Sequence, residues 1–211
     1  MTMAFTSTQL NPRAGVAWTN LLNAVSSVTW PGLAQGQESK VPTKIAYDQR
    51  GNVTRWGIKC ELDSGTPDEV HECFKIFLDQ SCADEAIRRE GPNLPANITG
   101  AKNLTTDYLR QIYQYTAKTI QQKTGPWKDK KVEFIFSTPT TWRTLDTANV
   151  FLEAIRDAGF GSENPMKHSA TLELTEAEAA AVQIVGNPPL RFDKDDILLI
   201  CDGKKEYSSF P

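Results

Sequence analysis

The sequence lacks the features that mark membrane-spanning, secreted and disulfide-built proteins. It contains no run of about 18 consecutive apolar residues, so a membrane span is not expected. Residues 1–11 are polar and have no charged region followed by an apolar core, so they do not predict a secretory signal. Only four cysteines occur in 211 residues, and a chain of this length does not need disulfides. We therefore expect a cytoplasmic protein with free thiols.

Metal-ligating side chains are also sparse. His71 and Cys73 lie two positions apart, and Cys82 follows at a wider spacing. A structural zinc site needs four ligands at tighter spacing, and positions i and i+2 of a helix, which we expect here, point apart. The sequence therefore predicts no metal site, and it predicts no bound cofactor.

Neither sign of charge is in large excess. The chain has 23 basic and 26 acidic side chains and a net charge of −3, so we expect no basic surface and no nucleic-acid partner. Hydrophobic residues make up 39% and charged residues 23%, which is typical of a globular protein. The length fits one large domain, or two small subdomains that share a core.

Strand patterns dominate the first half of the chain, and helical periodicity begins near its middle. Apolar or β-branched runs separated by turn residues predict a meander of antiparallel strands at residues 15–18, 25–30, 44–47 and 53–60. Residues 67–80 place apolar side chains on one face of a predicted helix, and residues 105–123 predict a longer helix.

The last third alternates between apolar strands and amphipathic helices. Strands are predicted at residues 132–136, 171–174 and 197–201, and helices at residues 141–158 and 175–185. Thr175 and Glu178 have the spacing of a capping box at the start of the last helix. This alternation predicts parallel strands in an α/β layer.

Several strings, in the right order, resemble the seventy-kilodalton heat-shock protein family. The string VEFIFSTP at residues 132–139, with Trp142 and a helix that ends in DAGF at residues 157–160, is similar to the family's passage of strand, T-x-P, helix and A-G-F. LTEAEAAA at residues 174–181 is similar to its N-E-P-T-A-A-A, and ILLICD at residues 197–202 to its second phosphate strand. Upstream, residues 14–18, 30–32 and 41–48 resemble a divergent fungal branch of the family.

This resemblance implies an α/β fold, the first lobe of an actin-like ATPase (ribonuclease H-like). A mixed sheet flanked by helices would carry a smaller inserted α+β subdomain. The core subdomain would comprise residues 1–50 and 126–211, and the inserted subdomain residues 51–125. The family's second lobe, which supplies the adenosine pocket, would begin after Asp202, so we expect a truncated nucleotide-binding domain.

The positions that match the family's phosphate loops depart from its pattern. Its first loop reads D-x-G-T-T, and here Thr8 and Leu10 replace the aspartate and glycine, with Asn11 and Pro12 in place of the threonines. The second reads D-x-G-G-G-T, and here Asp202 is followed by GKKEYS. Phosphate binding needs close backbone N–H donors, which glycine favours and proline removes. We therefore expect that ATP binding and hydrolysis are lost.

Two acidic residues match functional positions of the family and are the candidate catalytic residues. Glu176 matches the glutamate that orders water and metal, and Asp202 matches the aspartate of the second phosphate loop. They could form an acid/base pair in a cleft. The alternative is structural, with Glu176 as a favourable charge at a helix N-terminus and Asp202 as a turn residue. Lys59 lies near the family's catalytic lysine but out of register, so we give it no role.

The remaining conspicuous residues have ordinary structural explanations. Five tryptophans are expected to pack in the core or between subdomains. His168 has the intrinsic pKa of a general base, but we expect it to be a surface histidine. Residues 128–131, with three lysines, are expected to form a solvated turn.

These observations leave several hypotheses for function. The first is a pseudo-ATPase repurposed to bind or convert a small molecule in the former nucleotide cleft, as a cofactor-independent isomerase or cyclase. The second is a non-catalytic protein that binds a partner or forms a homodimer through the face exposed by loss of the second lobe. An ordinary ATPase or chaperone would need phosphate loops, a second lobe and a peptide-binding domain. The last is a truncated gene product without function.

Overall fold

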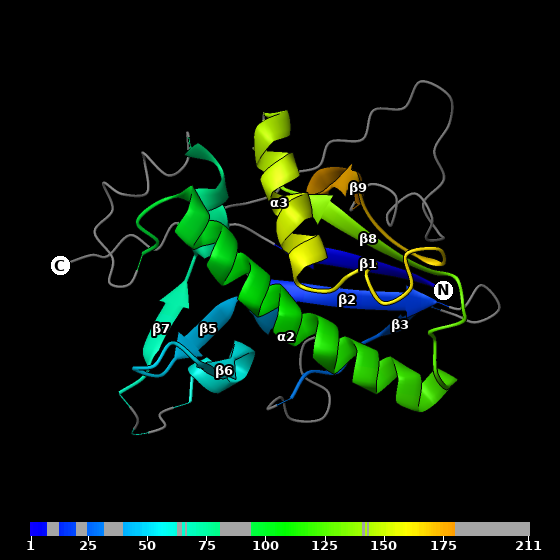
Figure 1. Ribbon diagram of the computed structural model, residues 1–211, viewed down its shortest axis with the longest axis horizontal. Helices are drawn as coiled ribbons and strands as arrows, with labels where there is room; N and C mark the ends of the chain where they lie inside the picture. Colours follow the sequence, from blue (N-terminus) through cyan, green and yellow to red (C-terminus); the bar gives the residue numbers. More distant parts are fainter. Residues whose placement is uncertain are drawn as a thin grey trace, which may run out of the picture.

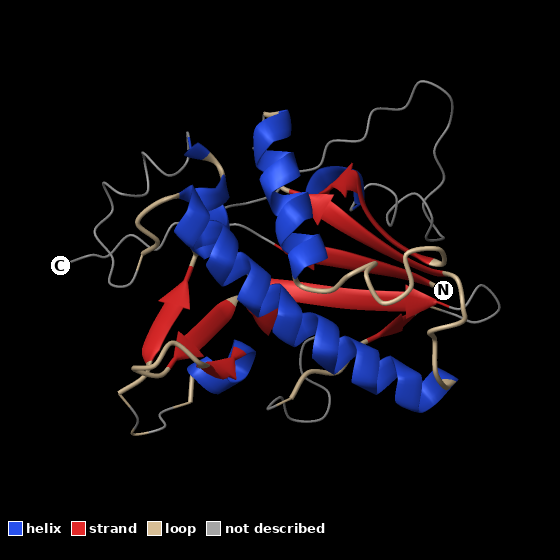
Figure 2. Cartoon of the chain, viewed as in Figure 1, coloured by secondary structure: helices blue, strands red, loops and turns tan. Residues whose placement is uncertain are grey.

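The computed structural model describes residues 1–7, 13–19, 25–31, 40–62, 65, 67–80, 94–140, 142 and 144–179. These residues form a mixed α/β structure with a larger and a smaller sheet, crossed by one long helix (Figures 1 and 2). The coarse prediction of an α/β fold is therefore confirmed.

The larger sheet combines antiparallel and parallel pairing, in the order β3-β2-β1-β8-β9, with β4 also paired to β2. Its antiparallel part joins β1 to β2, and β2 to β3 and β4, whereas β1, β8 and β9 are parallel. The strands are β1 (Thr2–Ser7), β2 (Arg13–Thr19), β3 (Ser26–Ser27), β4 (Lys40–Pro42), β8 (Val132–Thr138) and β9 (His168–Thr175). The parallel pairing predicted for the last third is confirmed for β8 and β9.

The smaller sheet is a three-stranded antiparallel unit in the order β6-β5-β7. Its strands are β5 (Lys44–Tyr47), β6 (Val53–Trp56) and β7 (Glu69–Glu72), and two short 3₁₀ helices follow β6 and β7: η1 (Gly57–Cys60) and η2 (Phe74–Leu78). The predicted single meander is therefore wrong, because its four segments divide between two sheets. The predicted subdomain boundary at residues 50 and 51 falls between β5 and β6, and the division into subdomains stays a prediction.

The predicted helix at residues 67–80 is also wrong. Its first half is β7, which pairs with β5, and its second half is η2. Between them Cys73 has a φ of 57°, a left-handed conformation that an α-helix does not contain. Pairing with a distant strand has overridden the local apolar periodicity.

Two α-helices, α2 and α3, lie within the residues that the structure describes. α2 (Ile98–Thr124) begins at Asn97, whose side chain accepts a hydrogen bond of 2.8 Å from the Gly100 N–H. α3 (Leu145–Asp157) begins after Thr144, which caps it in the same way through the Thr147 N–H. α2 lies against α3 and η2 and crosses both sheets (Figure 1). Both helices were predicted, α2 with a later start.

Aromatic side chains from α2, β8 and the following loops form the centre of the core. Phe134 of β8 is fully buried and contacts the rings of Tyr113, Trp127 and Phe160. Trp30 is also buried and stacks on Tyr115. The prediction that tryptophans serve as core is confirmed for Trp30 and Trp127.

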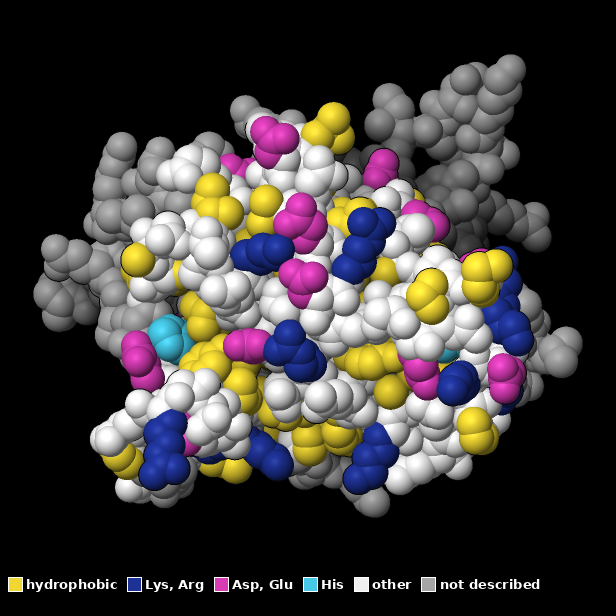
Figure 3. Space-filling model, viewed as in Figure 1, with side chains coloured by type: hydrophobic (Ala, Val, Ile, Leu, Met, Phe, Trp, Pro, Cys, Tyr) yellow, Lys and Arg dark blue, Asp and Glu magenta, His cyan; other side chains and the backbone are white. Residues whose placement is uncertain are grey.

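The described surface carries mixed charges. On the face shown in Figure 3, basic and acidic side chains are interspersed and form no large patch of one sign. Residues 128–131 are exposed, as predicted for a solvated turn. Neither α2 nor α3, nor any other helix in the described ranges, is both long and apolar enough to span a bilayer.

Candidate functional site

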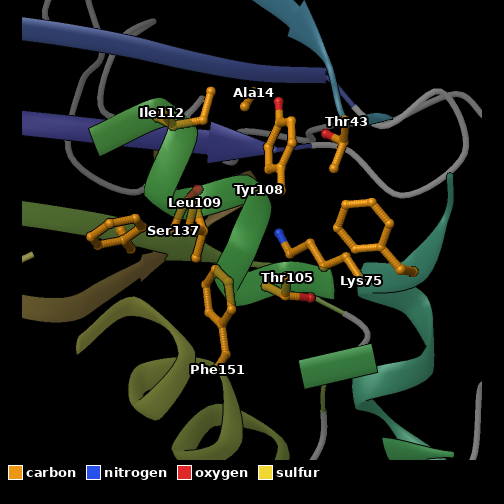
Figure 4. Close-up of a pocket in the computed structure, with 11 residues that line it drawn as sticks. Ala14, Thr43, Lys75, Thr105, Tyr108, Leu109, Ile112, Ser137 and Phe151 are labelled. Atoms are coloured by element: carbon orange, nitrogen blue, oxygen red, sulfur yellow. The ribbon is translucent and has the colours of Figure 1, made fainter. Parts of the chain in front are cut away.

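A pocket lies where α2, η2, β8 and α3 meet. The space between its walls measures about 450 Å³, a figure that includes space open to solvent. Its walls are mostly apolar, and one charged side chain, Lys75, reaches into it between Tyr108 and Phe151 (Figure 4). The other lining residues are Ala14, Thr43, Phe74, Thr105, Leu109, Ile112, Phe136 and Ser137.

The local geometry of η2 explains why Lys75 is buried. A 3₁₀ helix has three residues per turn, so side chains at i and i+3 share a face. Lys75 and Leu78 have this spacing, as do Phe74 and Phe77, and all four are buried. The left-handed turn at Cys73 ends β7 and directs the chain into η2. Two faces of this short helix therefore pack inward, and one of them carries a cation.

The environment of the Lys75 ammonium is poor in polar partners. Its Nζ lies 3.8 Å from Glu176 Oε1, with only 7% of the lysine side chain and 14% of the glutamate side chain exposed. No described residue accepts a hydrogen bond from Nζ. The ring centroids of Phe151 and Trp142 lie 5.1 and 5.3 Å away, in the range of cation–π contacts.

These surroundings lower the pKa of Lys75 from its ordinary 10.5 to about 8. Burial is the larger cause because it disfavours the charged amine, and the negative charge of Glu176 opposes it by raising the pKa. A lysine with this pKa exchanges protons close to neutral pH. It can therefore act as a base or a nucleophile, which a lysine at 10.5 does poorly.

Glu176 is held in place by the predicted capping box, which the structure confirms. β9 ends at Thr175, and residues 176–179 are helical. The Thr175 N–H donates to Glu178 Oε2 over 2.7 Å, and the Glu178 N–H donates to Thr175 Oγ1 over 3.2 Å. These reciprocal bonds fix the first turn of the helix, and so the backbone that presents Glu176 to Lys75.

The structure therefore places one of the two predicted catalytic residues. Glu176 does not itself line the pocket but lies 3.8 Å from the Nζ of Lys75, which does. Asp202 and residues 8–12, which match the first phosphate loop, lie outside the described residues. The predicted pairing of Glu176 with Asp202 stays a prediction. Lys59 is exposed on η1 and does not line the pocket.

Lys75 was missed by sequence reasoning. The signal was present, because a lone lysine stands inside the apolar run FKIFL. On the helix predicted at residues 67–80, this lysine was not assigned to the apolar face. Only the 3₁₀ geometry of η2, with its different periodicity, turns the lysine toward the core.

The expectation for His168 is wrong. Its side chain is 4% exposed rather than at the surface, because β9 begins there and pairs with the inner strand β8. Its Nε2 lies 3.2 Å from the Trp127 carbonyl oxygen, and its ring meets Trp127 and Phe134 edge-on. This histidine is a core residue and does not line the pocket.

The other histidine shows no metal-binding geometry. His71 lies on β7 rather than on a helix, with its Nε2 3.6 Å from Glu69 Oε1 and its ring against Tyr47. Cys60 and Cys73 are free thiols, as expected. Within the described ranges, no group of three or more His, Cys, Asp or Glu side chains is placed to hold a metal ion.

Comparison with known proteins gives limited similarity. No model of a protein family matches the chain, and no curated protein sequence matches it. Among solved structures, MreB5 of Spiroplasma citri bound to ADP is similar, with a TM-score of 0.41 and 13% sequence identity. The match covers 86% of this chain and 40% of that structure's chain, so this chain spans less than half the length of the similar protein.

Proposed function

We propose that this chain is a diverged lobe of the actin-like ATPase fold that binds or converts a small molecule in the pocket around Lys75 and Glu176. The reaction would be cofactor-independent acid/base chemistry, such as an isomerisation or cyclisation. The observation that carries the proposal is the buried Lys75–Glu176 pair at an apolar pocket. A buried charge pair is costly for stability, so its presence in a pocket favours a functional explanation.

The proposed origin is supported by sheet topology and by the motifs of the sequence. A mixed sheet flanked by helices, with a separate small sheet in the first half of the chain, agrees with the architecture that the heat-shock-type resemblance implies. The proposed loss of ATP binding is supported by residues that stand in the phosphate loops. Pro12 has no backbone N–H to donate, and residues 204 and 205 are lysines where the family has glycines.

The pair could catalyse a proton shift in a small carbonyl compound. Neutral Lys75 removes a proton from the carbon next to the carbonyl, and the resulting ammonium is stabilised by Glu176 at 3.8 Å. The apolar walls lower the local dielectric constant, which strengthens this electrostatic interaction. Return of the proton to a different carbon completes an isomerisation, and attack of the enolate on a second carbonyl completes a cyclisation.

Hydrogen–deuterium exchange tests this proposal. We expect the protein to accelerate exchange at the α-carbon of cyclohexanone in D₂O, followed by NMR. Lys75→Met and Glu176→Gln should reduce the rate, whereas Lys59→Met, which alters an exposed lysine, should not. Equal rates in all four proteins would contradict acid/base chemistry at this pocket.

Calorimetric titration with Mg-ATP tests the proposed loss of nucleotide binding. We expect no binding at micromolar nucleotide, and micromolar affinity would overturn the interpretation of the loops.

The alternative function, a non-catalytic protein that self-associates or binds a partner, stays a prediction. Sedimentation equilibrium tests its homodimer form.

A further inference from the structure

Two of the hydroxyl groups that line the pocket donate hydrogen bonds to backbone carbonyls. Thr105 Oγ1 donates to the Ala101 carbonyl over 2.8 Å, and the Tyr108 hydroxyl donates to the Pro42 carbonyl over 3.1 Å. The Lys75 ammonium has three N–H donors, and no described residue accepts a hydrogen bond from it. Compared with water, the pocket therefore favours an uncharged nitrogen over an ammonium ion.

We propose that Lys75 forms an imine with a small, uncharged aldehyde or ketone that enters this pocket, an inference that rests on the proposed small-molecule function. An imine nitrogen is uncharged and has no N–H, so it removes the three donors that the pocket leaves unsatisfied. The adjacent aromatic rings of Phe151 and Phe74 offer an apolar surface for the organic part of the ligand.

The reaction needs no further reagent. The lone pair of neutral Nζ attacks the carbonyl carbon, and a proton moves from nitrogen to the former carbonyl oxygen to give a carbinolamine. Glu176, at 3.8 Å, first takes the proton that the Lys75 ammonium loses before the attack, and then passes this proton to the hydroxyl group, which leaves as water. The carboxylate finally takes the remaining N–H proton and releases it to solvent. Amine and carbonyl compound thus yield imine and water, with no change of oxidation state.

The protonation state of Lys75 suits this attack. With its pKa lowered to about 8, about a tenth of the amine is neutral at pH 7, compared with about one in three thousand for an ordinary lysine. Only the neutral amine is nucleophilic, so Lys75 gains a large advantage over exposed lysines.

The charge of the pocket selects among carbonyl compounds. Glu176 places a carboxylate beside the reacting nitrogen, so a ligand with its own carboxylate would bring two negative charges together in an apolar site. A neutral aldehyde meets no such repulsion. The structure therefore favours simple aldehydes and ketones over α-keto acids.

Reductive trapping tests the inference with two matched probes. The protein is incubated at pH 7 with benzaldehyde or with phenylglyoxylate, each with sodium cyanoborohydride, and adducts are located by peptide mass mapping. Labelling at Lys75 is expressed relative to Lys59 in the same digest, which cancels the intrinsic reactivity of each probe. We expect benzaldehyde to label Lys75 at least about tenfold more than Lys59, and phenylglyoxylate to show no such preference.

A Glu176 variant tests the role of the carboxylate, and the two assays together distinguish the imine from the acid/base function. Glu176→Gln should slow benzaldehyde labelling and restore labelling of Lys75 by phenylglyoxylate. Equal labelling of Lys75 and Lys59 by benzaldehyde in the wild-type protein would overturn the inference. If deuterium exchange depends on Lys75 but no adduct forms, the proposed acid/base function holds and the imine fails. If the adduct forms without accelerated exchange, the imine holds and the isomerase function fails.

Discussion

Replacing Lys75 with methionine should remove a cost of folding that depends on pH. Methionine has a similar length and no charge, so the variant removes a buried cation while it keeps most of the packing in the pocket. Such a cost is expected where a residue is kept for function.

The magnitude follows from the pKa of Lys75 in the two states. The pKa is about 8 in the folded protein and 10.5 in the unfolded chain, a difference of about 2.5 units or about 3 kcal/mol. Because the folded pKa is the lower one, the unfolded chain binds more protons between these values, so the free energy of unfolding rises with pH across this window. Below about pH 8 the burial cost of the cation is present in full.

The assay is urea unfolding of wild type and Lys75→Met at several pH values. The free energy of unfolding of the variant, relative to that of wild type, should fall by about 2 kcal/mol between pH 7 and pH 9.5. Loss of the contact with Glu176 destabilises the variant at all these pH values, so the trend with pH is the decisive quantity. Lys59→Met is the control and should show no such trend. A pH-independent difference for Lys75→Met would refute the reasoning.

Three further predictions concern single residues. Glu176→Gln should lower the pKa of Lys75 further, because the carboxylate raises it, and an NMR titration of the amine checks this. Gly57→Ala should destabilise by more than about 1 kcal/mol, since φ is +62° and the new Cβ would lie 2.5 Å from a side-chain carbon of β4; Gly51→Ala, with φ +80° and open space, should cost less by urea unfolding. Thr175→Ala should cost about 1 kcal/mol in the same assay through loss of the cap, and an unchanged midpoint would contradict the capping role.

Sequence reasoning succeeded where structure is encoded locally. β8 alternates buried and half-buried side chains, and α2 and α3 carry long amphipathic patterns with side-chain caps. These elements, and the capping box at Thr175, could be predicted from a few neighbouring residues.

It failed where pairing between distant segments decides the structure. The residues of β7 fit a helical pattern, but β7 pairs with β5, in the register that sets His71 opposite Ile45. β1 was not predicted, yet it is held between β2 and β8 in the middle of the larger sheet. Neither pairing leaves a local signal in the sequence.

The candidate site was half predicted for the same reason. Glu176 was found because it belongs to a recognisable string beside a capping box. Its partner Lys75 comes from a different part of the chain, and it reaches the pocket only through the turn at Cys73 and the 3₁₀ helix that follows. A single sequence indicates neither this contact nor the burial that lowers the pKa of the lysine.

The central claim is that Lys75 is a buried amine with altered reactivity in a functional pocket. Its most direct test is the pH titration of the Lys75 amine, observed by NMR after reductive ¹³C-methylation and assigned with Lys75→Met. We predict a pKa of about 8, well below the ordinary value of 10.5. A value near 10.5 would show that the amine is solvated, and would contradict the pocket chemistry proposed for it.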